Sequence, residues 1–296
     1  MPMPSEGLNF LSKDVSSNSC IYSTCWVIAL RAEAAPIIKF LKLKNVNTQS
    51  NFIIYANEEL GHALIISGVG AIKSAAATAF LKAYFNIKNH AAWINLGIAG
   101  YYTEPLGNLY QAIKVFSPVH QRTFFPGFRF SKIIPGTSLL TVNKAETNYN
   151  NPVLYDMEAF GFCEVASAFS CNELIFVFKI VSDTPKNPIK KLKSSIIEDL
   201  INKNLRDLKE LLFDINKLSD LEMERFKIPD EVIEIENSTH FSKTNSFKFR
   251  QLYKKWKFAN PRKTLKDLQF SKKKAKEIIS VLENNISSNK KNRDYL

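Results

Sequence analysis

The chain contains 296 residues, of which 45% are hydrophobic and 12% aromatic, and its formal net charge is +12 at pH 7. This composition excludes a disordered chain, and the length suits one large α/β domain with or without an appendage. No apolar run reaches the ~18 to 20 residues that a membrane-spanning helix requires, so we expect no membrane span.

The positive charge belongs to one end of the chain. Residues 241–296 contain 16 lysines and arginines and 4 acidic residues, so this segment alone has a charge of +12. Residues 1–240 contain 24 basic and 24 acidic residues and are neutral overall. Contact with nucleic acid is therefore predicted only for residues 241–296, and only as a weak contact.

The N-terminus, the cysteines and the histidines bear on the compartment and on cofactors. Residues 1–24 lack the basic start and the apolar run of a signal peptide, so we interpret them as a polar leader. The four cysteines show no metal-ligand spacing, and Cys163 and Cys171 are too far apart along a predicted helix to bridge easily. No two histidines stand four residues apart, so neither a metal nor another cofactor is expected. A reducing, cytoplasmic location is predicted.

Strand-like and helix-like segments alternate along the neutral part of the chain. Short apolar runs predict strands at residues 25–30, 51–58, 62–70, 91–100, 111–118, 137–143 and 173–183. Helical spacing of apolar residues predicts helices at residues 32–43, 74–85, 158–169 and 194–218. Pro36 fits the first helix only if it lies in the first turn. The alternation predicts an α/β fold, with three α/β/α layers around a central mixed, mostly parallel sheet.

Small and polar residues follow three of the predicted strands. Gly68-Val69-Gly70, the small-residue loop 97–100 and Ser182-Asp183 all fall at predicted strand C-termini. In open α/β sheets, ligands bind beyond the carboxyl ends of the strands. The three segments therefore predict a site at one edge of the sheet.

The composition changes near residue 219. From there the sequence is charged and mixed, and it then becomes basic up to a Lys- and Asn-rich end. We therefore predict a leader at 1–24, an α/β domain at 25–218 and a basic, mostly helical C-terminal extension at 219–296.

Two acidic side chains stand at the ends of apolar elements. Met157-Glu158 opens an apolar helical stretch, and Ser182-Asp183 closes an almost wholly apolar strand. Cleavage of an N-glycosidic bond needs such a pair, because positive charge develops on the sugar and negative charge on the leaving base. One carboxylate holds the sugar and the other protonates the base, a step that contributes about 10²–10⁴-fold.

Six segments in this order resemble the purine nucleoside phosphorylase/nucleosidase superfamily, and the pattern is most similar to methylthioadenosine/S-adenosylhomocysteine nucleosidase. The segments are 29–37, 67–78, 94–100, 106–115, 155–166 and 178–184. The resemblance covers roughly residues 25–215, which is almost the whole neutral body. It implies a purine nucleoside as substrate, water or phosphate as co-substrate, and a homo-oligomer.

The resemblance also implies roles for single residues. Glu33 matches the glutamate that activates water. Met157 matches the methionine under the ribose, and Glu158 matches the glutamate that holds the ribose hydroxyls. Asp183 matches the aspartate that protonates purine N7, with Ser182 beside it.

Two further positions follow from the resemblance. Lys179 stands where the nucleosidases carry an arginine near the attacking water. Ala99 and Gly100 match the end of the Gly-x-Ala-Gly loop, which binds water in hydrolases and phosphate in phosphorylases.

The sequence departs from the family pattern in three ways. The residues that usually contact the purine after the strand at 137–143 have no clear match, and Asn143 and Glu146 are only candidates for them. Ile98 replaces the small polar residue of the Gly-x-Ala-Gly loop, which predicts a drier pocket for water or phosphate. Only about fifty residues separate Gly107 from Asp156, so part of the usual pocket for the base and the 5′ group is expected to be missing.

The reaction type stays open between two alternatives, with hydrolysis favoured. Phosphorylases bind phosphate with a Gly-rich turn and arginines, whereas here the first loop offers Arg31 without a glycine. The three carboxylates could also have purely structural roles. Asp183 could cap the following segment, and Glu33 and Glu158 could serve only the dipoles of helix N-termini.

The basic tail has two interpretations. Aromatic and cationic residues alternate in Phe247–Arg250 and Trp256–Phe258, and Lys272–Lys274 follow, a pattern typical of contacts with phosphodiester backbones. In that case the chain is a weakened nucleoside-binding module with a tail that contacts nucleic acid. The favoured alternative is a helical appendage that packs Leu252 and Trp256, together with Leu265, on the body.

Overall fold

The computed structural model describes residues 22–103, 105–130, 132–188, 193–268, 270 and 274–291. They form two compact units, which divide between Arg225 and Phe226. Most of the predicted leader lies outside the described residues, as do Lys272 and Lys273 of the basic tail.

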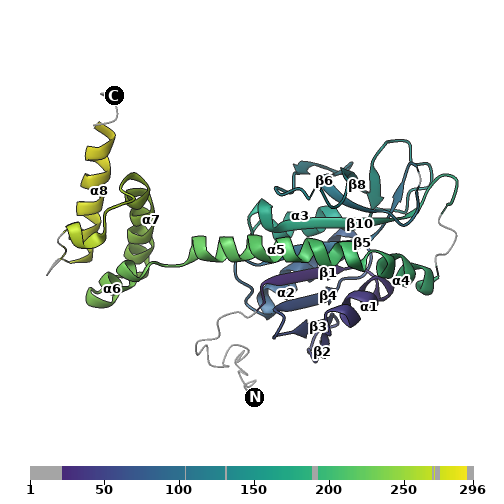
Figure 1. The fold of residues 1–296 in the computed structure, drawn as a ribbon, viewed down its shortest axis with the longest axis horizontal. Coiled ribbons are helices and arrows are strands. Elements are labelled where there is room, and N and C mark those ends of the chain that lie inside the picture. The colour runs from purple at the N-terminus through teal and green to yellow at the C-terminus, as the bar shows by residue number, and fades with distance from the viewer. Residues whose placement is uncertain are drawn as a thin grey trace, which may run out of the picture. The chain divides into compact units, whose positions relative to one another are not determined.

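A ten-stranded sheet forms the centre of the first unit (Figure 1). Its strands are β1 (Thr24–Ile28), β2 (Lys44–Val46), β3 (Ile53–Asn57), β4 (His62–Ile66), β5 (Ala92–Tyr101), β6 (Leu109–Ser117), β7 (His120–Phe124), β8 (Gly136–Thr141), β9 (Leu154–Asp156) and β10 (Ile175–Asp183). The strand order is β10-β6-β8-β9-β5-β1-β4-β3-β2, and β7 pairs with β6. Because β10 also pairs with β5, the strands β5, β9, β8, β6 and β10 close into a ring.

The sheet is mixed, as predicted. Strands β4, β1, β5 and β10 run parallel to one another in this order, so their carboxyl ends meet at one edge. Strands β2, β3, β7 and the β5–β9 and β6–β10 pairs supply antiparallel partners around them. Parallel strands buried by helices are expected to be continuous apolar runs, which is why the sequence reveals them well.

Helices cover both faces of the sheet and give the predicted three layers. They are α1 (Arg31–Phe40), α2 (Ala71–Tyr84), α3 (Ala159–Ala166), α4 (Ser194–Lys203) and α5 (Leu205–Phe226). Helices α2 and α3 share one apolar core with the sheet, whereas α1, α4 and α5 share another. In β1, Cys25 and Val27 face the first core, and Trp26 and Ile28 face the second. This alternation follows from the two-residue period of a strand.

Three predictions about local structure are wrong. Pro36 lies inside α1 beyond the first turn. The 97–100 segment is part of β5 and not a loop, because it continues the parallel pairing with β10 up to Gly100. The helix predicted at 194–218 is divided at Asn204, whose side-chain amide donates to the carbonyl oxygens of Leu200 and Gly107, each at 2.9 Å.

Helices α2 and α3 approach each other closely at Gly161. A Cβ atom on this residue would lie 1.9 Å from the carbonyl oxygen of Ala71, which is the first residue of α2. Only glycine permits this backbone contact. The contact fixes the start of α3, and with it Glu158, beside the start of α2.

The second unit consists of helices with a core of their own. Its elements are α6 (Asp230–Ser238), α7 (Lys243–Ala259), the short 3-10 helix Leu265–Leu268 and α8 (Ala275–Lys291). Trp256 and Leu265 are buried in this core, and Leu252 packs against it. No helix in the described part of the chain is both long enough and apolar enough for a membrane span.

Candidate functional site

A cavity of about 190 Å³ opens at the edge where the parallel strands end. Its walls contain all but one of the residues that the sequence singled out: Glu33, Ala99, Gly100, Met157, Glu158, Ser182 and Asp183. They come from the start of α1, from β5, from the β9–α3 junction and from the end of β10. The remaining residue, Lys179, is 1% exposed and is not part of the cavity wall.

Glu33 lies in the first turn of α1 and is only 3% exposed, so it is not a solvated first-turn acid. Its Oε2 accepts the N–H of Leu30 at 2.9 Å, and its Oε1 accepts the N–H of Ile98 on β5 at 2.8 Å. Burial raises the pKa of the Glu33 carboxyl, although the Lys179 ammonium and the two N–H groups act in the opposite direction. A carboxylate with a raised pKa is a better base toward water.

Glu158 precedes the first residue of α3 and points toward the N-terminus of α2. Its Oε1 accepts the N–H of Gly70 at 2.8 Å, and its Oε2 accepts the N–H of Met157 at 3.2 Å. Gly70 is the N-cap of α2, where the helix dipole favours a negative charge. Burial, followed by the charge of Asp156, nevertheless raises the pKa of Glu158 to about 7.

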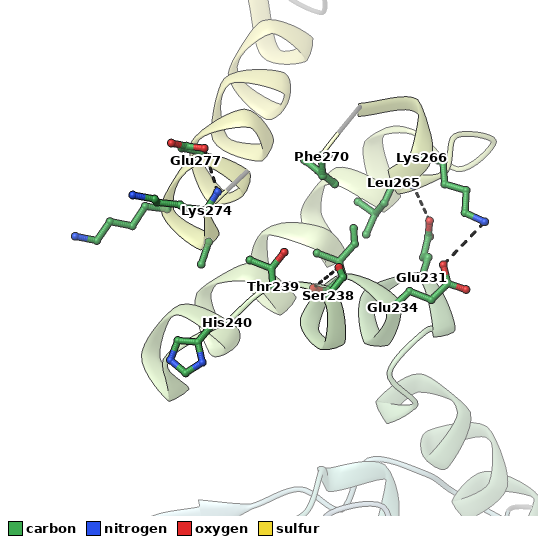
Figure 2. A pocket seen from close by; sticks show the side chains of 13 residues that line it. Glu231, Glu234, Ser238, Thr239, His240, Leu265, Lys266, Phe270, Lys274 and Glu277 are labelled. Carbon is green, nitrogen blue, oxygen red and sulfur yellow. Dashed lines mark hydrogen bonds and ion pairs between the residues drawn. The ribbon is translucent and has the colours of Figure 1, made fainter. Parts of the chain in front are cut away.

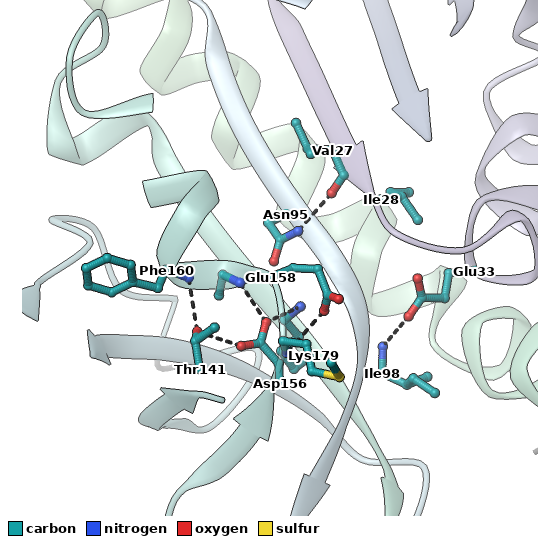
Figure 3. A network of polar contacts seen from close by, with 12 residues as sticks. Val27, Ile28, Glu33, Asn95, Ile98, Thr141, Asp156, Glu158, Phe160 and Lys179 are labelled. Carbon is teal, nitrogen blue, oxygen red and sulfur yellow. Dashed lines mark hydrogen bonds and ion pairs between the residues drawn. The ribbon is translucent and has the colours of Figure 1, made fainter. Parts of the chain in front are cut away.

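Lys179 forms a buried ion pair with Asp156, one of the residues that line the cavity (Figure 3). The Nζ–Oδ2 distance is 2.8 Å, and both side chains are at most 2% exposed. Asp156 also accepts hydrogen bonds from the hydroxyl of Thr141 at 2.7 Å and from the N–H of Ala159 at 2.8 Å. Every polar contact of the carboxylate is therefore made inside the protein, as a buried charge requires.

The ammonium of Lys179 interacts electrostatically with three carboxylates. Burial alone would lower the pKa of Lys179, but Asp156, Glu158 and Glu33 together outweigh it and raise the pKa above its usual value. Lys179 thus stays charged and balances part of the negative charge of the site. The sequence did not reveal Asp156 as its partner, although a lysine inside an apolar strand indicates a buried opposite charge.

Asp183 closes β10 and is 3% exposed. Its Oδ1 accepts a hydrogen bond from the hydroxyl of Ser182, and its Oδ2 accepts one from the hydroxyl of Tyr149. Gly100 on the neighbouring strand leaves the space for this arrangement. A Cβ there would lie 2.3 Å from Cε1 of Tyr149 and 2.8 Å from Oδ2 of Asp183.

Tyr149 is a residue of the site that the sequence did not predict. It lies in the connection between β8 and β9 with a φ of 43°, a left-handed backbone that costs a bulky residue about 1–3 kcal/mol. Its ring is 4% exposed and meets the ring of Tyr155 edge to face, with centroids 5.5 Å apart. Burial and the Asp183 carboxylate raise the pKa of the Tyr149 hydroxyl, so this group stays a donor.

The raised pKa of Glu158 predicts a pH-dependent stability difference for Glu158→Gln. The unfolded chain loses this proton near pH 4.5, whereas the folded chain keeps it until about pH 7. The folded state therefore binds more protons between these values, and the wild-type chain loses stability as pH rises through this range. The neutral variant avoids that loss. We expect its advantage in the free energy of unfolding to grow from near zero at pH 4 to about 3 kcal/mol above pH 7.

Urea denaturation at unit steps of pH measures this difference. Glu59→Gln, which changes an exposed glutamate of the same unit, serves as the matched control and should show no such trend. A difference between Glu158→Gln and wild type that stays constant from pH 4 to pH 8 would show that folding does not shift the pKa of Glu158.

A larger hollow of about 1030 Å³ lies in the second unit (Figure 2). Three of its charged groups already make contacts within that unit. Glu231 accepts the N–H of Leu265 and the hydroxyl of Tyr253, both at 2.6 Å, and Lys266 pairs with Glu234 at 3.9 Å. Because these contacts hold helices together, the smaller cavity with its cluster of buried carboxylates is the better candidate for chemistry.

The comparisons with known proteins bear on the fold. No protein-family model and no curated protein matches the amino-acid sequence. Among solved structures, the 5′-methylthioadenosine nucleosidase of Arabidopsis thaliana matches with a TM-score of 0.56 and 16% identity, over 67% of this chain and 98% of that chain. This chain shares its fold.

Two Helicobacter pylori structures show the same likeness. The 5′-methylthioadenosine/S-adenosyl homocysteine nucleosidase matches with a TM-score of 0.53 and 13% identity, over 66% of this chain and 99% of that chain. Futalosine hydrolase also matches with a TM-score of 0.53 and 13% identity, over 66% of this chain and 98% of that chain. At these identities the likeness establishes the fold only. The substrate and the activity have to be inferred from the residues of the site.

Proposed function

We propose that the first unit is a purine nucleoside N-ribosyl hydrolase that acts on an adenosine-type nucleoside, such as methylthioadenosine or S-adenosylhomocysteine. One observation carries the proposal. Glu33, Glu158 and Asp183, from three different segments, are buried around one cavity at the carboxyl edge of the parallel strands. The nucleosidase fold of the matching structures agrees with this assignment.

Each carboxylate has a role that suits its surroundings. Glu33 takes a proton from the attacking water, because burial raises its pKa. Glu158, with Met157 beside it, holds the hydroxyls of the ribose. Its pKa of about 7 means that its carboxyl group is about half ionised near neutral pH. Asp183 delivers a proton to the base, and Ser182 orients its carboxyl group. Lys179 is a positioning residue for Asp156, Glu158 and Glu33, whose charges it balances.

Water is favoured over phosphate by the charges of the cavity wall. No lysine or arginine is among the described residues that form it, whereas five acidic residues line it: Glu33, Glu146, Asp156, Glu158 and Asp183. A phosphate dianion would meet negative charge without a cation to pair with, which is costly at a buried site. Phosphorolysis therefore remains only the alternative reaction.

The test is the release of free base from a panel of nucleosides, with and without phosphate. The purified full-length chain is incubated with methylthioadenosine, S-adenosylhomocysteine or inosine, and the base is separated by chromatography. We expect release without phosphate and no acceleration by phosphate. Release that requires phosphate would replace the hydrolase with the phosphorylase, and no release from any purine nucleoside would leave a binding module.

The resemblance predicts a homo-oligomer and the cysteine pattern predicts a cytoplasmic location, and both stay predictions. A mass above 33.7 kDa by light scattering would support the oligomer.

A second candidate function concerns helix α7. Its buried face carries Trp256 and its neighbours into the core of the second unit. Its other face exposes Phe247 by 67% and Phe258 by 83%, with Lys254 and Lys255 between them. In the described part of the chain no ion pair engages these two lysines, so the face offers positive charge and two ring surfaces. We infer a weak, sequence-tolerant contact with single-stranded nucleic acid.

Fluorescence anisotropy of a labelled 20-nucleotide single strand tests this contact. Lys254→Gln combined with Lys255→Gln should weaken binding and flatten the salt dependence by a slope of about 1.4, since each phosphate contact contributes about 0.7. Lys39→Gln combined with Lys44→Gln, on exposed positions of the first unit, is the matched control. Equal binding by both double variants, or no binding at 50 mM salt, would remove this function.

A further inference from the structure

The hydroxyl of Tyr149 occupies one of the two carboxyl oxygens of Asp183. The Ser182 hydroxyl engages Oδ1, and the Tyr149 hydroxyl engages Oδ2, the oxygen beside Gly100. Both oxygens of this buried carboxyl group are therefore satisfied before any substrate arrives. A base that is to receive a proton from Asp183 must take the place of one of these hydroxyls.

The cavity is also small for a nucleoside. Its volume of about 190 Å³ is below the ~300 Å³ at which pockets for small molecules begin. The Tyr149 ring forms part of the cavity wall, and Gly100 and Tyr155 pack against it. Withdrawal of this ring would enlarge the cavity on the side of Asp183, where the base belongs.

The backbone conformation of Tyr149 shows that the surrounding structure holds this residue in place. A bulky residue adopts a φ of 43° only when its surroundings hold it there. Three hydrogen bonds hold the backbone of this connection. Glu146 accepts the N–H groups of Thr147 and Asn148 at 2.8 and 2.9 Å, and the N–H of Asn151 donates to the Tyr155 hydroxyl at 3.0 Å.

We infer that Tyr149 is the specificity-determining residue of the base subsite: it closes Asp183 in the free protein, and a purine enters by displacing its hydroxyl. The inference rests on the proposed function for the identity of the ligand. A ligand with a nitrogen that forms a hydrogen bond with Asp183 can compensate for the lost contact between Tyr149 and Asp183. A ligand without such a nitrogen leaves a buried carboxyl group unsatisfied. The apparent affinity of every base is reduced, because the closed form has to open first.

Two variants test whether Tyr149 is a gate, whose hydroxyl a base displaces, or whether the Tyr149 side chain is a fixed part of the cavity wall. Tyr149→Phe keeps the ring and removes the hydroxyl, and Tyr149→Gly removes the ring and tolerates the left-handed backbone. Tyr84→Phe on the partly exposed side of α2 is the matched control for the loss of a hydroxyl. Calorimetry with adenine and with methylthioadenosine gives the dissociation constants, and base release gives kcat and KM.

We expect Tyr149→Phe to lower the dissociation constant of adenine at least fivefold, because one hydrogen bond no longer has to be broken. Tyr149→Gly should lower it as well, and Tyr84→Phe should leave it unchanged. A dissociation constant that is unchanged or higher in Tyr149→Phe overturns the gate, as does the absence of binding in all variants. Tighter binding without base release supports the gate and refutes the hydrolase, whereas base release with unchanged binding does the reverse.

Discussion

Asp183→Asn should release base at least a hundredfold more slowly than the wild-type chain. Asparagine has nearly the same shape and can still accept the Tyr149 hydroxyl, so the fold and the cavity should persist. It has no proton to give to the leaving base, and a positioned general acid is worth about 10²–10⁴-fold. The dissociation constant of methylthioadenosine should change much less than kcat, because the ribose contacts proposed for Glu158 are untouched.

Asp199→Asn is the matched control, since Asp199 is an exposed residue of α4 and does not line the cavity. Its kcat should equal that of the wild type. If Asp183→Asn kept near-wild-type turnover, Asp183 would have no part in the reaction. If its affinity and its kcat fell together, Asp183 would be a binding residue and not the acid.

Lys179→Met should lower the free energy of unfolding by about 3–5 kcal/mol, because it leaves the Asp156 carboxylate buried without its cation. Glu33 and Glu158 lose the same cation, which deepens the loss. In a unit of this size such a change lowers the melting temperature by about 10 °C. Thermal unfolding followed by circular dichroism measures it.

The double variant Lys179→Met with Asp156→Asn separates charge from packing. Removal of both charges leaves no isolated buried ion, so the double variant should recover a large part of the lost stability. A double variant no more stable than Lys179→Met would show that the lysine stabilises the unit through its packing. A single variant as stable as the wild type would mean that the buried pair contributes nothing net.

The sequence revealed the parts of the fold that rest on long apolar patterns. Strand β10 and strand β1 are buried on both faces, so their runs contain little but apolar residues. The sequence did not predict the short strands β2 and β9, because three residues are too few to show a hydrophobic period. The break at Asn204 was not predicted either, because its cause is a side-chain hydrogen bond to the distant Gly107.

The candidate site was visible for a different reason. Motif order placed Glu33, Glu158 and Asp183, and the carboxyl edge of a parallel sheet then brought them together. Asp156 and Tyr149 were not predicted, because their importance depends on partners far away in the chain. Tyr149 in particular lies in an Asn-rich connection, where composition indicates a turn but not which side chain points inward.

The hydrogen bonds from Ile98 and Gly70 have a consequence for variation at this site. Glu33 and Glu158 are each oriented by a peptide N–H of another segment, and the side chains of residues 98 and 70 take no part in those bonds. Position 98 can therefore exchange isoleucine for serine or threonine without moving Glu33, whereas proline would abolish the donor. Peptide groups therefore orient Glu33 and Glu158, so the side chain at position 98 can vary while both acids keep their places.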